Sequence, residues 1–237
     1  MTIERNAAPP PEPAPTPVVG SASATSGPTP VQIRLQILST EHWSLLASRG
    51  LAWNETFARA GMFLSTLSGS MVALGLIAGA DGFKDAFFVF ALVILPVVLF
   101  IGIGTWIRMG ASNYHDAQTI FGMNRIRGAY LEIAPELEPY FVTSSHDDPR
   151  GVLISSMAFT DIARLQPFVA VPGLVAVIDS VVAGTIAGIA SLASGAGTAL
   201  TLILGGVAFA LSVGGFGLYA KTQIAARRRA FVVRFPS

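Results

Sequence analysis

The sequence predicts an all-α membrane protein: a four-helix bundle made of two transmembrane hairpins, with a cytoplasmic helical extension and a disordered Pro-rich N-terminal tail. Composition is the first reason, because 52% of the 237 residues are hydrophobic and 12% are charged, against about 25% charged in ordinary soluble proteins. Charge distribution is the second. Between Arg164 and Lys221, Asp179 is the only Asp, Glu, Lys or Arg, which is typical of membrane spans.

Residues 1–30 predict the disordered tail. The stretch "NAAPPPEPAPTPVVGSASATSGPTP" holds eight of the chain's fifteen prolines and no aromatic residue. Such a composition cannot bury enough apolar surface to offset the entropy lost on ordering. The stretch also lacks the apolar core of a signal peptide. A solvated tail is the main interpretation, and a ligand for a proline-recognising domain is the alternative.

Residues 31–59 predict a cytoplasmic helix that continues into the first span. Trp43, Leu46, Trp53 and Phe57 recur at helical spacing on one face, and no helix-breaking residue intervenes before the span. At 1.5 Å per residue, residues 34–80 would form one rod of about 70 Å. The apolar stripe needs a partner, and we expect the central cytoplasmic loop to supply it.

Four segments are long and apolar enough to cross about 30 Å of hydrocarbon. The short links "DGFKD" and "SLASGAG" force antiparallel neighbours, so residues 60–107 form one hairpin and 168–220 the other. Pro96 predicts a kink in the second span. The predicted spans are residues 60–80, 86–107, 168–190 and 198–220.

The basic residues predict the orientation. Cytoplasmic segments of membrane proteins are enriched in Lys and Arg, and here Lys84 is the only basic residue in the two short links. Both termini and the central loop are therefore expected in the cytoplasm, and the protein in the plasma membrane. The basic residues on that side are Arg34, Arg49, Arg59, Arg108, Arg125, Arg127, Arg150, Arg164, Lys221, Arg227, Arg228, Arg229 and Arg234.

The central loop, residues 108–167, is predicted to be mostly helical. "GASNYHDAQTIFGMNRIRGAYLEI" has helical periodicity, "APELEPYF" breaks it with two prolines, and "SSHDDPRG" has the composition of a turn. "VLISSMAFTDIARL" then resumes as helix before the third span. Residues 221–237 form a basic C-terminus. There Arg227, Arg228 and Arg229 either bind anionic headgroups or serve as an ordinary positive-inside anchor.

No catalytic pattern is present in the sequence. His and carboxylate residues cluster in "EHW", "YHD" and "HDDPRG", but a metal site would need three or four of these side chains to converge. The sequence contains no phosphate-binding loop, dinucleotide fingerprint or nucleophile elbow. With no cysteine and a net charge of +1, thiol chemistry is excluded and nucleic-acid binding has no support. We predict a protein that is not an enzyme and holds no metal or cofactor.

Small residues recur every four positions in three of the predicted spans. Such stripes let helix backbones approach closely in lipid. They indicate packing either within one bundle or between copies, and three striped helices favour a homo-oligomer. The stripes are Gly61, Ser65, Gly69 and Ala73; Ala176, Ser180, Gly184 and Gly188; and Gly206, Ala210 and Gly214.

Asp179 lies at the middle of the third predicted span, where an ionised carboxylate costs at least about 2.5–3.5 kcal/mol. No Lys or Arg lies at that depth in another span. One interpretation is a structural acid that is either protonated or hydrogen-bonded by hydroxyls of the first span at the same depth. The other is a proton or cation site in a hydrated path. The hydroxyl residues are Ser65, Thr66, Ser68 and Ser70.

The runs "EHWSLLASRGLAWNETFARAGMFLSTLSG" and "GMNRIRGAYLEIAPELEPYFVTSSHDD" resemble a group of uncharacterised four-span membrane proteins of actinobacterial type. The resemblance covers residues 34 to about 164 and implies no activity or functional residue. The stripes and the tail favour an oligomeric scaffolding or interaction module with a cytoplasmic protein partner. A small ion channel, or a proton- or cation-coupled transporter that uses Asp179, is the alternative.

Overall fold

The computed structural model describes residues 28–156, 171–228 and 232–237. Every regular element in these ranges is helical, which confirms the predicted all-α class, and four of the helices are long and apolar enough to cross a membrane. The predicted tail, residues 1–30, lies almost wholly outside the described residues. The elements are α1 (Pro30–Asp81), α2 (Asp85–Ile133), η1 (Pro135–Tyr140), α3 (Pro149–Ser155), α5 (Val171–Ala193) and α6 (Thr198–Arg228).

Helix α1 is the predicted rod, an unbroken helix of 52 residues. A capping box starts it: the Thr29 hydroxyl accepts from the Gln32 N–H, and the Gln32 side chain accepts from the Thr29 N–H. Pro30 takes the first helical position, where its missing N–H costs nothing. The helix ends at Gly82, whose φ of 72° favours glycine.

Helix α2 is longer than the sequence predicted. Its 49 residues run from Asp85 through Pro96 and Gly110 to Ile133, well past the predicted end of the span at residue 107. Nothing in "GASNYHDAQTIF" forces a turn, and side chains such as Ile120 and Met123 are buried well beyond the apolar span. The helix ends where Pro135 follows, since a proline disfavours helical geometry in the residue before it.

The second hairpin also matches its prediction. A turn containing Gly195, at φ 84°, joins α5 to α6. Helix α6 runs on past the predicted end at residue 220 to Arg228. The predicted start of the third span at residue 168, and most of the helix predicted after residue 151, lie outside the described residues; α3 covers Pro149–Ser155.

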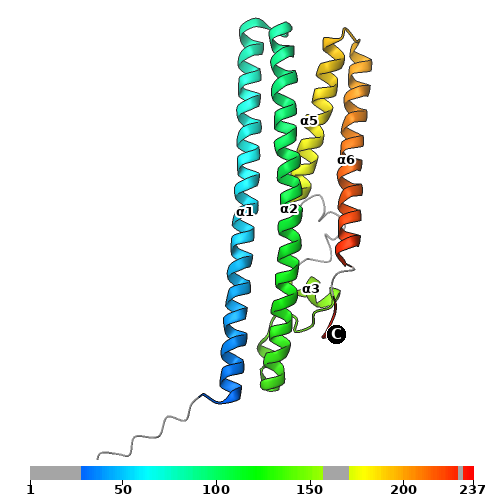
Figure 1. Cartoon of the computed structure of the whole chain (residues 1–237). Helices are drawn as coiled ribbons and strands as arrows, with labels where there is room; N and C mark the ends of the chain where they lie inside the picture. Colours follow the sequence, from blue (N-terminus) through cyan, green and yellow to red (C-terminus); the bar gives the residue numbers. More distant parts are fainter. Residues whose placement is uncertain (1–27, 157–170, 229–231) are drawn as a thin grey trace, which may run out of the picture.

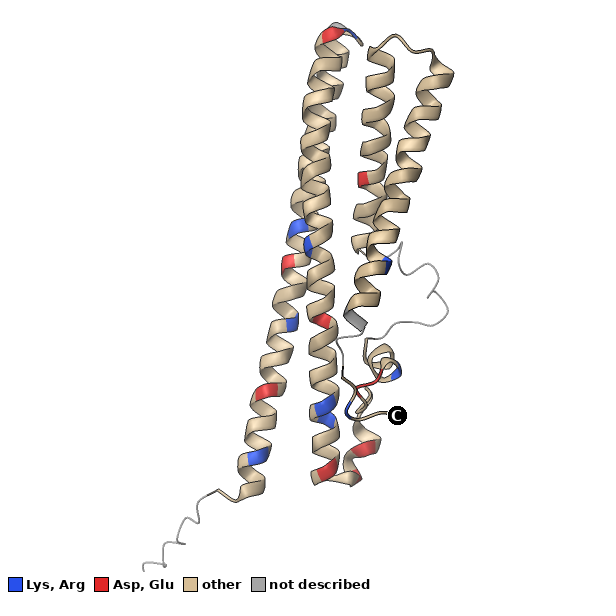
Figure 2. Cartoon of the chain, turned by 45° about the vertical axis from the view of Figure 1, so that its right-hand side comes forward, with Lys and Arg blue, Asp and Glu red and all other residues tan. Residues whose placement is uncertain are grey.

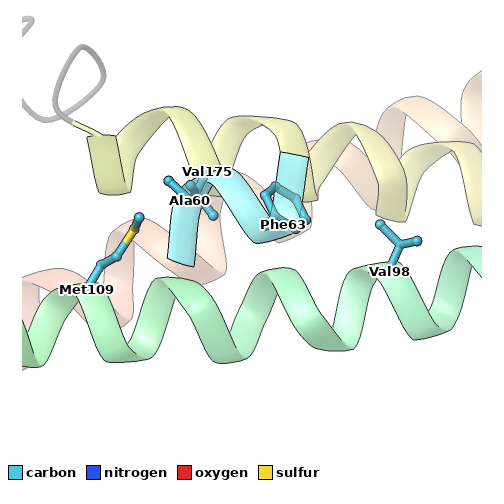
Figure 3. Close-up of a cluster of buried hydrophobic side chains, with 5 residues drawn as sticks. All are labelled: Ala60, Phe63, Val98, Met109 and Val175. Atoms are coloured by element: carbon cyan, nitrogen blue, oxygen red, sulfur yellow. The ribbon is translucent and has the colours of Figure 1, made fainter. Parts of the chain in front are cut away.

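The four long helices pack as a row, with α1 on α2, α2 on α5, and α5 on α6 (Figure 1). Helix α2 is therefore the centre of the molecule. We call residues 30–59, 108–156 and 232–237 the base, since most of the charged side chains gather there (Figure 2). The apolar core lies along α2, where Ala60, Phe63 and Val175 pack between the levels of Met109 and Val98 (Figure 3).

The prediction that the central loop packs on the aromatic stripe of α1 holds only in small part, through the Trp53 indole N–H, which donates to Asp116 of α2. The central loop, as α2, does pack on the base part of α1, but on the neighbouring face: Leu45 contacts α2 at Gly122. Ion pairs between Arg49 and Asp116 (2.7 Å) and between Arg108 and Glu55 (2.9 Å) hold the same face. The stripe side chains stay exposed: Trp43, Leu46, Trp53 and Phe57.

Candidate functional site

Asp179 lies in the middle of α5 and is fully buried. It forms the single acidic band within the apolar hairpin of α5 and α6 (Figure 2). Its carboxyl group lies directly against Gly102 of α2: a Cβ built at Gly102 would overlap the carboxyl group, with Oδ2 2.5 Å away. Only glycine leaves room for the acid at this point of the α2–α5 contact.

Neither carboxylate oxygen of Asp179 has a hydrogen-bond partner among the described residues. The expected pairing with hydroxyls of the first span is therefore wrong. Thr66 and Ser70 donate instead to carbonyls of their own helix, at Met62 and Thr66. The physical reason is the row arrangement, in which α5 packs mainly on α2 and α6. The remaining predicted hydroxyls, Ser65 and Ser68, are exposed on α1.

The residue after Asp179 faces the other neighbour. The Ser180 hydroxyl donates to the Ala176 carbonyl at 2.7 Å and contacts the Ser212 hydroxyl of α6 at 3.1 Å. Consecutive helical residues point about 100° apart. Asp179 therefore faces α2 and Ser180 faces α6. The hydroxyl pair between α5 and α6 gives the Asp179 carboxyl group no hydrogen bond.

A cavity of about 220 Å³ lies at the foot of α5, where α1, α2 and α5 meet. Its wall is polar on the α1–α2 side: the Thr56 hydroxyl donates to Ser112 at 3.0 Å, and Asp116 accepts from Arg49 and from the Trp53 indole. We call it the basal cavity. It is lined by Ala52, Trp53, Thr56, Ser112, Asn113, Asp116, Val171 and Pro172.

An apolar layer separates the basal cavity from Asp179. Val175 lies one turn below Asp179 on α5, and Ala60 of α1 and Met109 of α2 belong to the same buried cluster on the side of the cavity (Figure 3). Met109 is fully buried, and Ala60 and Val175 are almost so. Sequence periodicity placed each of these residues in a helix but could not show that they converge below the acid.

The predicted small-residue stripes are used in part. Gly184 packs so closely on α6 that an added Cβ would lie 2.8 Å from the Gly205 carbonyl oxygen, and Gly188 faces Thr201. The α6 contact is thus Gly205 and not Gly206; adjacent glycines in "LGG" gave no way to choose the face. The other predicted packing glycines have open space among the described residues: Gly61, Gly69, Gly206 and Gly214.

A second buried carboxylate, Asp147 of the base, was treated in the sequence as part of a turn. It is fully buried, and it accepts from Arg125 Nε at 2.7 Å and from the backbone N–H groups of Arg234 (3.0 Å) and Phe235 (2.7 Å). Burial acts to raise the pKa of Asp147, but the Arg125 guanidinium and these N–H groups outweigh it and lower the pKa.

Neighbouring Asp148 holds the same C-terminal segment. Its carboxylate accepts from the Ser237 hydroxyl (2.6 Å) and N–H (2.8 Å), and it caps α3 by accepting from the Gly151 N–H. These bonds lower its pKa to about 2. We call the contacts of Asp147 and Asp148 with residues 232–237 the C-terminal clasp. No sequence pattern predicts it, because its partners are nearly 90 residues apart.

The remaining predicted sites divide as follows. Within the described residues no three His, Asp or Glu side chains converge as metal ligands. Arg227 and Arg228 form the last turn of α6, and Arg229 lies outside the described residues. Their binding to anionic lipid stays a prediction.

No family model, curated protein or solved structure matches the chain. The resemblance to four-span actinobacterial proteins therefore stays a prediction, and function is argued from the geometry alone.

Proposed function

We propose that the protein is a self-associating membrane scaffold in which two copies pack along α1. One observation carries the proposal: a single apolar face of α1 is exposed from the base into the first span. In the base it presents Trp43, Leu46, Trp53 and Phe57, of which Trp43 is 67% and Phe57 54% exposed. Contiguous exposed apolar patches of this kind mark interaction sites.

The same face continues into the membrane part. From Trp43 the steps are three or four residues, through Gly50 and on to Gly61 and Leu64, which keeps them on one side of the helix. Leu64 is exposed, and no described atom lies within 4 Å of a Cβ built at Gly50 or Gly61. Large side chains outside the bilayer, and Gly61 and Leu64 within it, thus share one exposed face. At its edge, the Trp53 indole also donates to Asp116.

A second copy of α1 fits this face best. The occupant must be a rod that is apolar at the height of the base and closely packing in the bilayer. Another α1, inserted in the same orientation, meets both demands at matching heights. Identical patches facing each other form a closed two-fold contact, the commonest symmetry of homo-oligomers. Small residues allow the close approach that drives association in lipid.

Cysteine cross-linking tests the contact, since the chain has no cysteine. Leu46→Cys places a thiol on the proposed face, and copper-phenanthroline oxidation in native membranes should give a disulfide-linked dimer. Leu51→Cys is the matched control: Leu51 is also exposed, but five residues turn the helix by about 140°. Equal cross-linking at both positions, or none at Leu46→Cys, would defeat the proposal.

The orientation belongs to the same proposal. We place the base, and with it both ends of the chain, on the cytoplasmic side of the plasma membrane, because the basic residues of the described chain lie at the base and the lower ends of the spans, with Lys84 at the far end. The base would then present its surface to a cytoplasmic protein partner. Thiol labelling of Ala80→Cys should succeed from outside intact cells, and that of Ser144→Cys only after permeabilisation.

A proton- or cation-conducting protein is the second candidate. The observation that favours it is the buried Asp179 carboxyl group, which has no partner among the described residues. Ionisable residues inside membrane spans often mark ion or proton paths. Liposomes holding the parent protein or Asp179→Asn, with a pH dye and a potassium gradient, test it. Flux in the parent that the substitution abolishes would support conduction, and absence of flux in the parent would remove it.

A further inference from the structure

We propose that Asp179 is a proton-binding site: its carboxyl group is held neutral against Gly102 and exchanges its proton with water of the basal cavity. This inference is independent of self-association along α1. It deepens the second candidate function by naming the proton as its ligand, and it requires no net flux.

The charge environment is the first step. On the helices around Asp179, Lys, Arg, His, Asp and Glu are absent from residues 60–80, 86–107 and 198–220, and Asp179 is the only one in 171–193. The one phenol in those segments, Tyr219, packs on Trp106. A buried carboxylate needs a cation or several hydrogen-bond donors to stay ionised, and the described residues supply neither. The neutral acid is the form this site accommodates.

The shape of the site is the second step. Gly102 is buried in α2, and its missing side chain provides the space that the Asp179 carboxyl group fills. The acid therefore points into the α2–α5 contact and away from lipid. A small apolar residue at position 179 would have packed there without any polar group. Because the carboxyl group fills the space beside Gly102, the site leaves room for no ligand larger than a proton.

The route is the third step. Val171 and Pro172, at the foot of α5, line the basal cavity, and Asp179 lies about 12 Å above Val171 along the helix. The cavity has polar groups that can hold water, including Thr56, Ser112 and Asp116. The layer of Ala60, Met109 and Val175 separates it from the acid. Met109 is flexible, so transient opening of this layer would let water reach Asp179.

A second apolar layer lies on the other side of Asp179, away from the basal cavity. Above Asp179, Val182 of α5 packs with Ala91 and Leu95 of α2 in a second buried cluster. The lower layer is the one that lies between Asp179 and the basal cavity, so the route is testable with matched substitutions in the two layers.

Infrared spectroscopy of the full-length protein, in a detergent without carbonyl groups, tests the proton. A carboxylic acid shows a C=O stretching band that a carboxylate lacks. We expect such a band at neutral pH, its loss in Asp179→Asn and its shift in Asp179→Glu, which retains an acid should the Asn variant fold poorly. A parent spectrum without the band, or a band that both variants leave unchanged, would overturn the proposal.

Transfer into D₂O tests the exchange and its route, because deuteration shifts the band. We expect a slow shift in the parent, a faster one in Val175→Ala, which thins the lower layer, and an unchanged rate in Leu95→Ala, which thins the upper one. Both side chains are buried, so the substitutions match. A band that never shifts would overturn exchange. Equal acceleration, or acceleration in Leu95→Ala alone, would overturn the basal route. The α1 cross-link is read separately and does not affect either result.

Discussion

The two buried aspartates of this chain have opposite surroundings. Asp147 and Asp179 are both 0% exposed. In the base, Asp147 accepts from one guanidinium and two backbone N–H groups. Between the spans, Asp179 has no partner among the described residues. Burial alone therefore does not set the charge state of an acid; the donors around it do. The donors around Asp147 favour its ionised form, whereas the lack of donors around Asp179 favours the neutral form proposed above.

The difference extends to what each acid does for the fold. Asp147 joins two segments far apart in the sequence, and the clasp depends on its charge. Asp179 joins nothing by hydrogen bonding, and the α2–α5 contact around it depends on the space left by Gly102. Asp147 stabilises the fold through its hydrogen bonds and ion pair. Asp179 only fills the space beside Gly102, which a different side chain could also fill.

The largest expected effect is the loss of the Asp147 charge. Asp147→Ala leaves Arg125 and two N–H groups without their acceptor. Breaking a fully buried ion pair costs about 3–5 kcal/mol. Because the Arg125 side chain is 36% exposed, we expect about 2–3 kcal/mol, seen as a lower thermal unfolding midpoint in detergent. Glu132→Ala is the control, since its pair with Arg34 is half exposed. An equal effect in the control would contradict the importance of the clasp.

Acid should release the clasp. The pKa of Asp148 is lowered from 3.8 to about 2, and that of Asp147 is also lowered. Their stabilisation is therefore complete above the unfolded-state value near 3.8 and is lost as the pH falls through the folded-state values. We expect amide hydrogen-exchange protection of Arg234, Phe235 and Ser237 to disappear between about pH 4 and 2. Protection of these amides that persists below that range would contradict it. Asp179, being neutral already, should not respond.

Filling the space beside Asp179 should cost less. Gly102→Ala places a methyl group on the carboxyl group, and overpacking of this kind typically costs about 1–3 kcal/mol. The end of a side chain can move aside, so we expect about 1 kcal/mol by thermal unfolding. Gly104→Ala is the control, because no described atom lies within 4 Å of its added Cβ. Adding Asp179→Ala to Gly102→Ala should restore stability. A loss that the double variant keeps would place the cost elsewhere.

The smallest effect is expected for Asp179→Asn. The amide has the shape of the neutral acid, and no described donor loses a partner. The change in unfolding free energy should stay below about 1 kcal/mol, whereas Asp147→Asn should destabilise the base by removing the charge that Arg125 pairs with. Comparable losses from the two Asn variants would erase the distinction between the acids.

The helices could be predicted from the sequence, since apolar length and short links depend on local residues. The α1 rod and both hairpins followed from the unbroken run before residue 80 and from "DGFKD" and "SLASGAG". Asp179 could be singled out for the same reason. Its neighbour could not: a hydroxyl on α1 and a glycine on α2 lie at similar depths, and the sequence does not say which helix packs on α5.

The base contains a second kind of contact that could not be predicted from the sequence. "HDDPRG" has the composition of an ordinary turn, and Asp148 does cap α3. Nothing near it indicates that Arg125, one helix earlier, and backbone groups around Phe235 meet at Asp147. Backbone donors carry no sequence signature, so contacts of this kind are hidden until the chain is folded. The choice of Gly205 over Gly206 at the α5–α6 contact has the same origin.

The length of α1 also sets the distance between the start of this helix and the bilayer. With the first span at residues 60–80, the thirty helical residues from Pro30 to Arg59 carry the start of the helix about 45 Å along its axis from the bilayer. Screening in physiological salt acts over about 8 Å, so the start of α1 at Thr29 and Pro30 lies beyond the reach of headgroup charge. A globular domain of about 30 Å could sit between the tip of the rod and the membrane without touching lipid.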